Sequence, residues 1–161
     1  MTLSLRPARP GDAALIAALV RELADYEHLA HEAVATEADF DVALFGPTPR
    51  VFCDIAEVDG EPVGLALWFY TFSTFLGRHG IWLEDLFVRP TARGKGAGKA
   101  LLAGLAARCQ TEKLGRLEWW VLDWNAPSIA FYKAMGAVAN DEWTQFRVAG
   151  PALERLAEAA R

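Results

Sequence analysis

Cysteine and long apolar runs are both scarce in this sequence. Only Cys53 and Cys109 occur among the 161 residues, and each stands among apolar neighbours. We therefore expect two reduced core thiols, as in a reducing compartment, rather than a disulfide or a reactive site. No apolar stretch reaches the ~20 residues that a membrane helix requires, and none follows Met1 as in a secretion signal. The expected protein is cytoplasmic and has no membrane partner.

Basic residues and histidine are also few. Sixteen Lys and Arg stand against 21 Asp and Glu, and the formal net charge is -5. The overall field of such a chain repels nucleic acid and favours cationic partners such as amines, so we expect no nucleic-acid partner. His28 and His31 are three residues apart but lack neighbouring ligands, so we expect no metal.

Apolar residues, in contrast, are abundant. Hydrophobic residues make up 53% of the chain and include six Trp and nine Phe, which predicts one packed domain over 1–161. Apolar periodicity and turn residues predict helices at 11–29, 36–45, 98–110, 126–136 and 151–160. They predict strands at 3–8, 81–88, 116–124 and 141–148, and a hairpin over 51–72 that turns at Asp59-Gly60. This order predicts a mixed α/β (α+β) fold around one mostly antiparallel sheet, with a strand–helix–strand crossover.

The stretch RPTARGKGAG, residues 89–98, leads from an apolar strand into a helix. The first backbone N–H groups of a helix have no partner within it, so they attract anions. Glycines let an anion approach the backbone and basic side chains add charge, which together suit a pyrophosphate. The residues in question are Gly94, Gly96, Gly98, Arg93, Lys95 and Lys99.

Other phosphate motifs fail on spacing. A Walker loop requires a hydroxyl residue where Ala100 stands, and a dinucleotide fingerprint requires glycine where Lys99 stands. The remaining alternative is a solvated helix start with incidental lysines. In that case the glycines in the helical part would each cost roughly 0.5–1 kcal/mol of helix stability without a use.

The motif from Arg93 to Gly98 resembles the phosphate-binding signature of the GNAT superfamily of N-acetyltransferases. The stretches YEHL (26–29), WLEDLFVRPTARGKGAGKALL (82–102) and LDWNAPSIAFYKAMGA (122–137) resemble its spermidine/spermine acetyltransferase branch, in matching order over roughly residues 3–148. The resemblance implies a GNAT-like sheet flanked by helices, with a central splayed strand pair. It also implies acetyl-CoA as co-substrate, no metal, and direct transfer of the acetyl group to a primary amine.

Acetyl transfer to an amine needs an acid–base partner. A primary amine with a pKa near 10.4 is almost fully protonated at pH 7, so the enzyme must bind the ammonium and remove a proton. Glu84 and Asp85 are neighbours in the apolar strand 81–88, where they should point to opposite faces unless a bulge re-aims them. The resemblance implies that Glu84 is the base, acting through water, and that Asp85 binds substrate. The alternative for both is a structural ion pair.

The resemblance also implies which residues surround the thioester. Tyr132 would be the general acid for the leaving thiolate, and Asn125 and Ser128 would contact the pantetheine arm. Alternatively, Asn125 caps a helix and Tyr132 is a core aromatic, roles that do not exclude catalysis. The rest of the implied cofactor-binding set is Leu86, Phe87, Val88, Arg93, Gly94, Lys95, Gly96, Ala97, Gly98 and Lys99.

Acidic and aromatic residues predict a wall that recognises an aminoalkyl cation by ion pairing and cation–π contact. The predicted set is Tyr26, Glu27, Trp82, Glu84, Asp85 and Trp143. The tryptophans at 68, 119, 120 and 124 are left out of it, because Trp in such a composition is more often a core residue than a binding residue. The loop at 72–80 departs from the polyamine enzymes, so diamines, polyamines and lysine-like amino acids such as thialysine all remain open as substrates. The branch forms dimers, which implies a homodimer.

Two other functions remain open beside a small-amine acetyltransferase. A non-catalytic acetyl-CoA-binding module would not need Glu84 and Tyr132, which are both present. A protein or peptide N-acetyltransferase would need an open groove, whereas the acidic and aromatic wall predicts a small cation.

Overall fold

The computed structural model describes residues 1–160 and consists of two compact units, Met1–Asn125 and the residues from Ala126 onward. The strands of the first unit are β1 (Leu3–Pro7), β2 (Phe52–Val58), β3 (Glu61–Ser73), β4 (Arg78–Val88) and β5 (Leu117–Glu118). Its helices are α1 (Ala13–Tyr26), α2 (Glu37–Phe45), α3 (Ala97–Thr111) and the short 3-10 helices Ala30–Glu32 and Pro90–Ala92. The second unit contains α4 (Ala126–Ala134) and α5 (Pro151–Glu158). No helix within residues 1–160 has the length and apolar character needed to cross a membrane.

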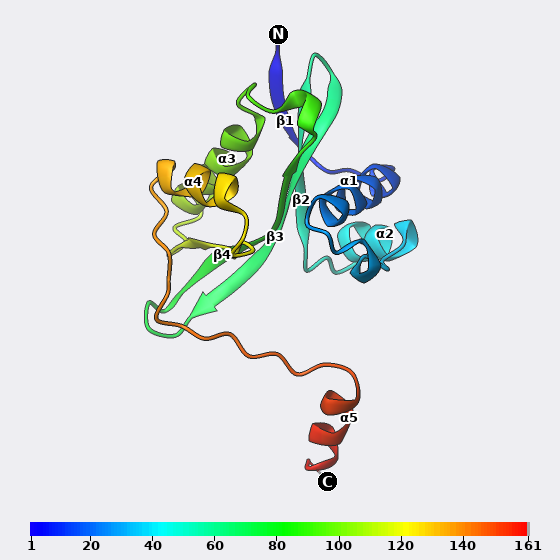
Figure 1. Cartoon of the computed structure of the whole chain (residues 1–161), viewed down its shortest axis with the longest axis vertical. Helices are drawn as coiled ribbons and strands as arrows, with labels where there is room; N and C mark the ends of the chain where they lie inside the picture. Colours follow the sequence, from blue (N-terminus) through cyan, green and yellow to red (C-terminus); the bar gives the residue numbers. More distant parts are fainter. Residues whose placement is uncertain (161) are drawn as a thin grey trace. The chain divides into compact units, whose positions relative to one another are not determined.

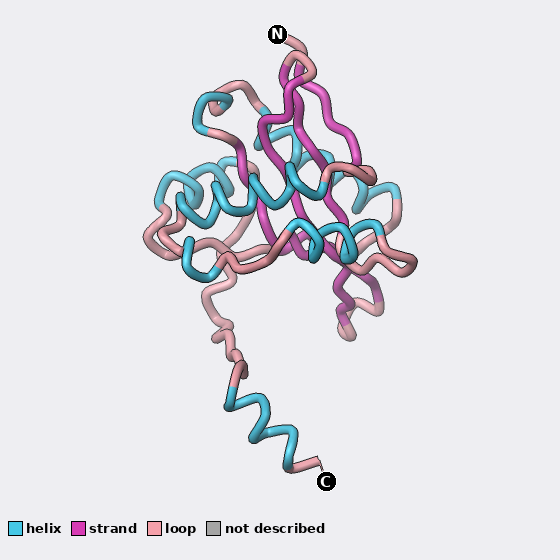
Figure 2. The backbone as a smooth tube through the Cα atoms, turned by 90° about the vertical axis from the view of Figure 1, so that its right-hand side faces the viewer, coloured by secondary structure: helices cyan, strands magenta, loops and turns pink. Residues whose placement is uncertain are grey.

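One sheet organises the first unit. Its strand order is β1-β2-β3-β4-β5, and every neighbouring pair is antiparallel except the parallel pair of β4 and β5. Helices α1 and α2 cover one face and α3 covers the other (Figure 1). Figure 2 looks onto the face that carries α1 and α2. The predicted mixed α/β class, with a mostly antiparallel sheet flanked by helices, is confirmed.

The core lies on both faces of this sheet. Under α1 and α2, a buried cluster joins the helices to the middle strands through Ile16, Leu19, Leu44, Cys53, Ile55, Leu65, Leu67 and Phe87. On the other face, Leu101 and Leu105 of α3 are at most 1% exposed. Burial of one such side chain contributes roughly 1.5–3 kcal/mol. The apolar rhythm that predicted these helices therefore also positions them on the sheet.

Local sequence signals define a predicted turn and a helix cap. Asp59 and Gly60 form the hairpin turn with positive φ angles of 53° and 83°, as a two-residue turn between twisted strands requires. Thr36 caps α2 in a capping box with Asp39. Asp12 occupies the N-cap position of α1 but makes no capping bond there. Its carboxylate instead accepts hydrogen bonds from Arg6, at 2.7 and 3.1 Å.

Two predicted strands are wrong in extent. The strand expected at 116–124 is reduced to Leu117–Glu118, because its pairing with β4 ends at Trp82, two residues before an irregularity in that strand. The strand expected at 141–148 is absent, since the described residues offer it no neighbouring strand with which to form a ladder. The alternating residues of 141–148 are therefore exposed.

Candidate active site

Strand β4 contains one residue more than the strand opposite it. Leu67 of β3 pairs with Asp85, whereas the next residue of β3, Trp68, pairs with Leu83. Glu84 is thus the extra residue of a β-bulge, which bends a strand and re-aims its side chains. The bulge therefore falls on one of the two adjacent acids that the sequence singled out.

The bulge turns both acids toward the face that α1 covers. Asp85 lies on that face because it is opposite Leu67 and two residues from Phe87, which both belong to the core under α1. The extra residue also returns Trp82 to this face, and the indole Nε1 of Trp82 donates a 2.8 Å hydrogen bond to Glu84. A regular strand would have divided the two acids between opposite faces.

A third acid, Glu27, approaches from the end of α1. Burial raises the pKa of Asp85 to about 7, and the negative charges of Glu84 and Glu27 add to the rise. Burial also raises the pKa of Glu27. We call Glu27, Glu84 and Asp85 the acid cluster. Within residues 1–160 no cation opposes the rise of the Asp85 pKa, and no such cluster has the arrangement of a metal site.

Trp82, which donates to Glu84, and Tyr26, which precedes Glu27 in the chain, each lie close to a further aromatic ring. The rings of Tyr26 and His28 lie 6.2 Å and 5.6 Å from the ring of Trp124, and Trp82 meets Trp120 edge-on at 5.3 Å. Trp120 and Trp124 are 44% and 51% exposed, so the expectation that tryptophans at these positions lie in the core was wrong. Their residue type alone did not distinguish them from core tryptophans.

The glycine turn follows β4 directly and begins α3. Gly94 and Gly96 have φ angles of 76° and 85°, which glycine adopts without strain. A Cβ atom at Gly94 would meet nothing within 4 Å, and one at Gly96 would meet only Leu3, at 3.9 Å. The main chain is therefore open to a ligand at the N-terminus of α3, where unpaired N–H groups favour a phosphate. The exposed side chains of Lys95 and Lys99 add positive charge.

Arg93 points back to the protein rather than outward from the turn. Its Nε donates to the carbonyl oxygen of Val88 at 3.0 Å. Its guanidinium lies 4.8 Å from the ring centre of Tyr26 and 5.9 Å from that of Phe87. Arg93 thus links the end of β4 to the end of α1. Phe87 and Val88 are buried, and Leu86 is partly buried.

The remaining predicted residues lie at the junction of the units or in the second unit. Asn125 ends the first unit, is 6% exposed, and accepts a 3.4 Å hydrogen bond from the hydroxyl of Tyr26. Ser128 and Tyr132 belong to α4, and the ring of Tyr132 lies 5.4 Å from that of Phe131. Trp143 is 74% exposed in the second unit. Their roles stay predictions.

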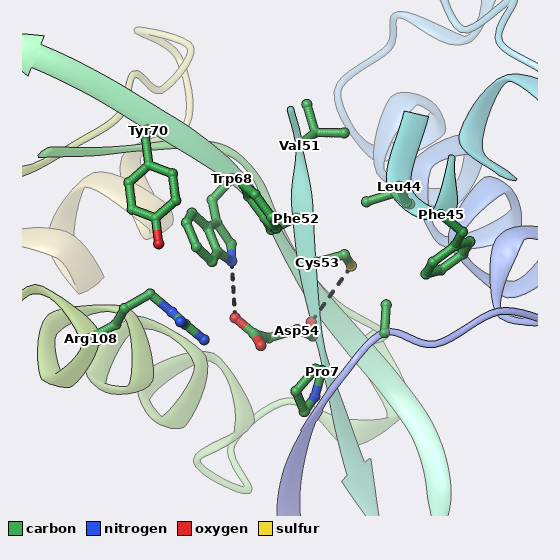
Figure 3. A pocket seen from close by; sticks show the side chains of 11 residues that line it. Pro7, Leu44, Phe45, Val51, Phe52, Cys53, Asp54, Trp68, Tyr70 and Arg108 are labelled. Atoms are coloured by element: carbon green, nitrogen blue, oxygen red, sulfur yellow. Dashed lines mark hydrogen bonds between the residues drawn. The ribbon is translucent and has the colours of Figure 1, made fainter. Parts of the chain in front are cut away.

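A pocket of about 180 Å³ lies elsewhere, around the start of β2 (Figure 3). On its polar side, the indole Nε1 of Trp68 donates to Asp54 at 3.0 Å, and the guanidinium of Arg108 lies 4.9 Å from a ring centre of Trp68. Burial raises the pKa of Asp54, while Trp68 and Arg108 partly oppose the rise. The other lining residues are Pro7, Ala8, Leu44, Phe45, Val51, Phe52, Cys53 and Tyr70. No predicted site residue lines this pocket.

Comparison with known proteins agrees with this geometry. Residues 16–137 match the model of the acetyltransferase (GNAT) family. The chain is 37% identical over 164 residues to thialysine N-epsilon-acetyltransferase of Bos taurus, covering 95% of this chain and 96% of that protein. It is 30% identical over 197 residues to L-ornithine N5-acetyltransferase of Arabidopsis thaliana, covering 94% and 86%. A solved integron cassette protein of V. cholerae aligns with a TM-score of 0.82 and 27% identity over 98% of this chain and 99% of that one.

The fold, the open glycine turn and these matches define an acyl-transferring enzyme. The chain belongs to the acetyltransferase (GNAT) family and is an amine N-acetyltransferase. The resemblance noted in the sequence is thereby confirmed.

Proposed function

We propose that this protein transfers the acetyl group of acetyl-CoA directly to the primary amine of a small cationic substrate. The observation that carries the proposal is the order of features along one strand and helix. Two acids of the cluster, Glu84 and Asp85, lie on β4, and the glycine turn that suits a diphosphate follows the end of the same strand. An ammonium at the acids and a nucleotide thioester at the turn would share one site.

The residues around the turn fit the diphosphate of acetyl-CoA. The positive φ angles of Gly94 and Gly96 and the space above them leave the main chain accessible. Main-chain N–H groups of residues 94–99 would bind the phosphates, with Lys95 and Lys99 nearby. The main chain of Leu86, Phe87 and Val88 would face the pantetheine arm, as the family resemblance implies.

The chain's own residues would move two protons. A carboxylate of the acid cluster accepts one proton from the bound ammonium, a role that the resemblance assigns to Glu84. Tyr132 gives the other to the departing sulfur, again by resemblance. Asn125 and Ser128 would hold the pantetheine arm. Attack of the free amine on the thioester then needs no metal.

The substrate we favour is a short amino acid with an amine at the end of its side chain. Two relatives of this chain are named for thialysine and for ornithine, which both fit that description. The acid cluster with Tyr26, Trp82, Trp120 and Trp124 offers the negative charge and ring faces that suit an ammonium. Diamines and polyamines are the competing substrates.

A homodimer is part of the proposal. Residues 137–149 form neither helix nor strand, although 141–148 alternates as a strand does. Trp143 and Phe146 on this segment are 74% and 90% exposed. A second copy would cover such side chains, and light scattering after gel filtration tests the mass. We also place the enzyme in the cytoplasm, because Cys53 and Cys109 are both free and buried.

The function is tested by measuring free thiol released from acetyl-CoA in the presence of single amines. The panel contains thialysine, ornithine, lysine, putrescine, spermidine and a lysine-containing peptide. We expect turnover with thialysine, ornithine and lysine, and weaker turnover with the peptide. Turnover with the peptide alone would favour a protein acetyltransferase, and binding of acetyl-CoA without any turnover would favour a non-catalytic module.

A pair of glycine variants tests the diphosphate site. Gly96→Val should weaken acetyl-CoA binding by at least ~10-fold in calorimetry, because its side chain covers the main chain where the phosphates approach. Gly60→Val is the control, since Gly60 has φ +83° against +85° at Gly96 and both have open space around them. The control carries the same backbone strain in the turn between β2 and β3, outside the glycine turn. Equal loss of binding in the two variants would refute the site.

A further inference from the structure

We propose that the side chain of Arg93 positions the amine-binding end of α1, so that a residue of the glycine turn also determines how tightly the amine is held. The inference rests on the proposed function and adds a positioning residue to that site. This role is additional to the place of Arg93 in the cofactor-binding set that the family resemblance implies. It follows from what the guanidinium contacts and from how α1 ends.

Arg93 contacts two elements at once. Its Nε donates a 3.0 Å hydrogen bond to the carbonyl oxygen of Val88, the last residue of β4. Its guanidinium also lies over the ring of Tyr26, the last residue of α1, at 4.8 Å from the ring centre. A planar guanidinium donates hydrogen bonds within its plane while its face lies on a ring, whereas a lysine ammonium has no such fixed geometry. Arg93 is therefore suited to hold the ends of β4 and α1 together.

The end of α1 carries one acid of the acid cluster, because Glu27 directly follows Tyr26. The chain turns at the next residue, where His28 has a φ angle of 60°, and the N–H of Leu29 donates to the carbonyl oxygen of Ala24 at 2.8 Å. These features terminate a helix and satisfy its last carbonyl groups. Helix ends fray, however. The side-chain contacts of Tyr26 with the rest of the first unit therefore help to fix where Glu27 lies.

Trp124 and Asn125 also contact the side chain of Tyr26, but more weakly. The ring of Trp124 is tilted by 52° and its centre lies 6.2 Å away. The hydroxyl of Tyr26 donates to Asn125 at 3.4 Å, which is longer than the roughly 2.5–3.0 Å usual for a hydroxyl donor. The cation over the ring is the stronger contact. We therefore expect the loss of Arg93 to displace Tyr26, and with it Glu27.

The test is the KM for thialysine of Arg93→Met at saturating acetyl-CoA, where weaker cofactor binding does not contribute. Arg93 is exposed, so the variant should fold. Methionine keeps much of the side-chain length but removes the donor to Val88 and the charge over Tyr26. The amine KM should rise ~3- to 10-fold with a smaller change in kcat. Arg93→Lys should recover part of the loss, because an ammonium over the ring is still attracted to it.

Lys95→Met is the control for the charge of the glycine turn. Lys95 is exposed on the same turn and lies two residues from Arg93. Its loss should weaken acetyl-CoA binding ~2-fold or more in calorimetry, because one positive charge is removed near the phosphates. The amine KM at saturating acetyl-CoA should not rise. An equal rise of the amine KM in Lys95→Met and Arg93→Met would show an effect of charge alone and overturn the proposal.

Arg89→Met is the control for the junction between the strand and the helix. Arg89 directly follows β4 and donates to Glu22 of α1 at 2.8 Å, one turn of helix before Tyr26. Its loss removes a link between the same two elements but not the contact with the ring. The amine KM should change by less than ~2-fold. A rise as large as that in Arg93→Met would show that any loosening of α1 suffices, which would overturn the specific role of Arg93.

A double-mutant cycle with Tyr26 tests the contact itself. Tyr26→Leu removes the ring, so Arg93→Met should raise the amine KM by less than ~2-fold in that background. Tyr26→Phe keeps the ring and should keep the full effect of Arg93→Met. The proposal fails if Arg93→Met has equal effects with and without the ring, or if it leaves the amine KM unchanged.

The contact is also measurable without activity. In NMR of the wild type we expect a nuclear Overhauser effect between the Arg93 side chain and the Tyr26 ring, and the ring signals should shift more in Arg93→Met than in Lys95→Met. Absence of that effect would overturn the proposal even if the amines are turned over. A wild type that shows it but acetylates none of the amines would instead refute the proposed function.

Discussion

Asp54 and Asp85 are two partly buried aspartates, on β2 and β4, that lie in opposite electrostatic settings. Asp54 accepts a 3.0 Å hydrogen bond from Trp68 and has the positive charge of Arg108 nearby, and both oppose the effect of burial on its pKa. No hydrogen bond or positive charge opposes the rise of the Asp85 pKa on burial, and the negative charges of Glu84 and Glu27 add to that rise. Both acids are desolvated, but only the charge of Asp54 is compensated from within the protein.

The difference shows how to separate a structural acid from one that serves a reaction. A buried carboxylate without hydrogen bonds or a counter-charge destabilises the fold when it ionises. Asp54 avoids this through Trp68 and Arg108. Asp85 has no such partner, and the ammonium of the proposed substrate has the charge that would compensate it. The following five variants test the contrast as differences in stability.

The largest effect is expected for Asp85→Asn at pH 8. The folded-state pKa of about 7 exceeds the ordinary value, so the stability of the wild type falls as pH rises from about 4 to 7. Asparagine has nearly the same shape and no charge, so the variant should be more stable at pH 8 by up to about 4 kcal/mol, and equal to the wild type below pH 4. Urea unfolding at several pH values measures this.

The matched Asp54→Asn variant should gain no more than ~1 kcal/mol at pH 8, because the compensated charge costs less to bury. Equal gains for the two variants would contradict the comparison, since they would show that Trp68 and Arg108 do not stabilise the ionised Asp54.

An intermediate effect is expected when the donor to each acid is removed. Trp68→Phe should lose ~2 kcal/mol or more of unfolding free energy at pH 7, because a buried carboxylate is left without its hydrogen bond and packing is lost. Trp82→Phe removes the same indole donor from Glu84, which is exposed and can bond water. It should cost below ~1 kcal/mol. Similar losses in chemical denaturation would show that burial does not distinguish the two acids.

The smallest effect is expected for Arg108→Gln. This change removes the positive charge near Asp54, the contact with Trp68, and the 3.0 Å ion pair with Glu112. We expect a loss of ~1–1.5 kcal/mol at pH 8 and a smaller loss at pH 4, where more of Asp54 is protonated. A loss that does not depend on pH would show that the charge of Arg108 plays no part in compensating Asp54.

Much of the fold could be predicted because its signals are local. Thr36 and Asp39 stand three residues apart and form a capping box at the start of a predicted helix, and Asp59-Gly60 forms the predicted hairpin turn. Such signals depend on a few adjacent residues. The prediction of a strand at 141–148 was wrong because strand formation is not local. A strand exists only where another strand forms hydrogen bonds with it.

The candidate site was predictable in its residue types but not in its geometry. The acids at 84 and 85 and the pair Tyr26 and Glu27 were identified from charge and motif. The bulge at Glu84 depends on the register between β3 and β4, which no pattern within 81–88 encodes. The exposure of Trp124 likewise depends on where β5 ends, at Glu118. Side-chain direction in this site is a property of strand pairing.

The bulge has a consequence for how such enzymes diversify. Pairing is regular on both sides of Glu84, from Leu67 opposite Asp85 and from Trp68 opposite Leu83. Deletion of the single codon for residue 84 would therefore restore an unbroken ladder, with Asp85 still on its present face and every downstream partner unchanged. A lineage could gain or lose one acid of the active site in one mutational event, without rebuilding the scaffold that carries the rest.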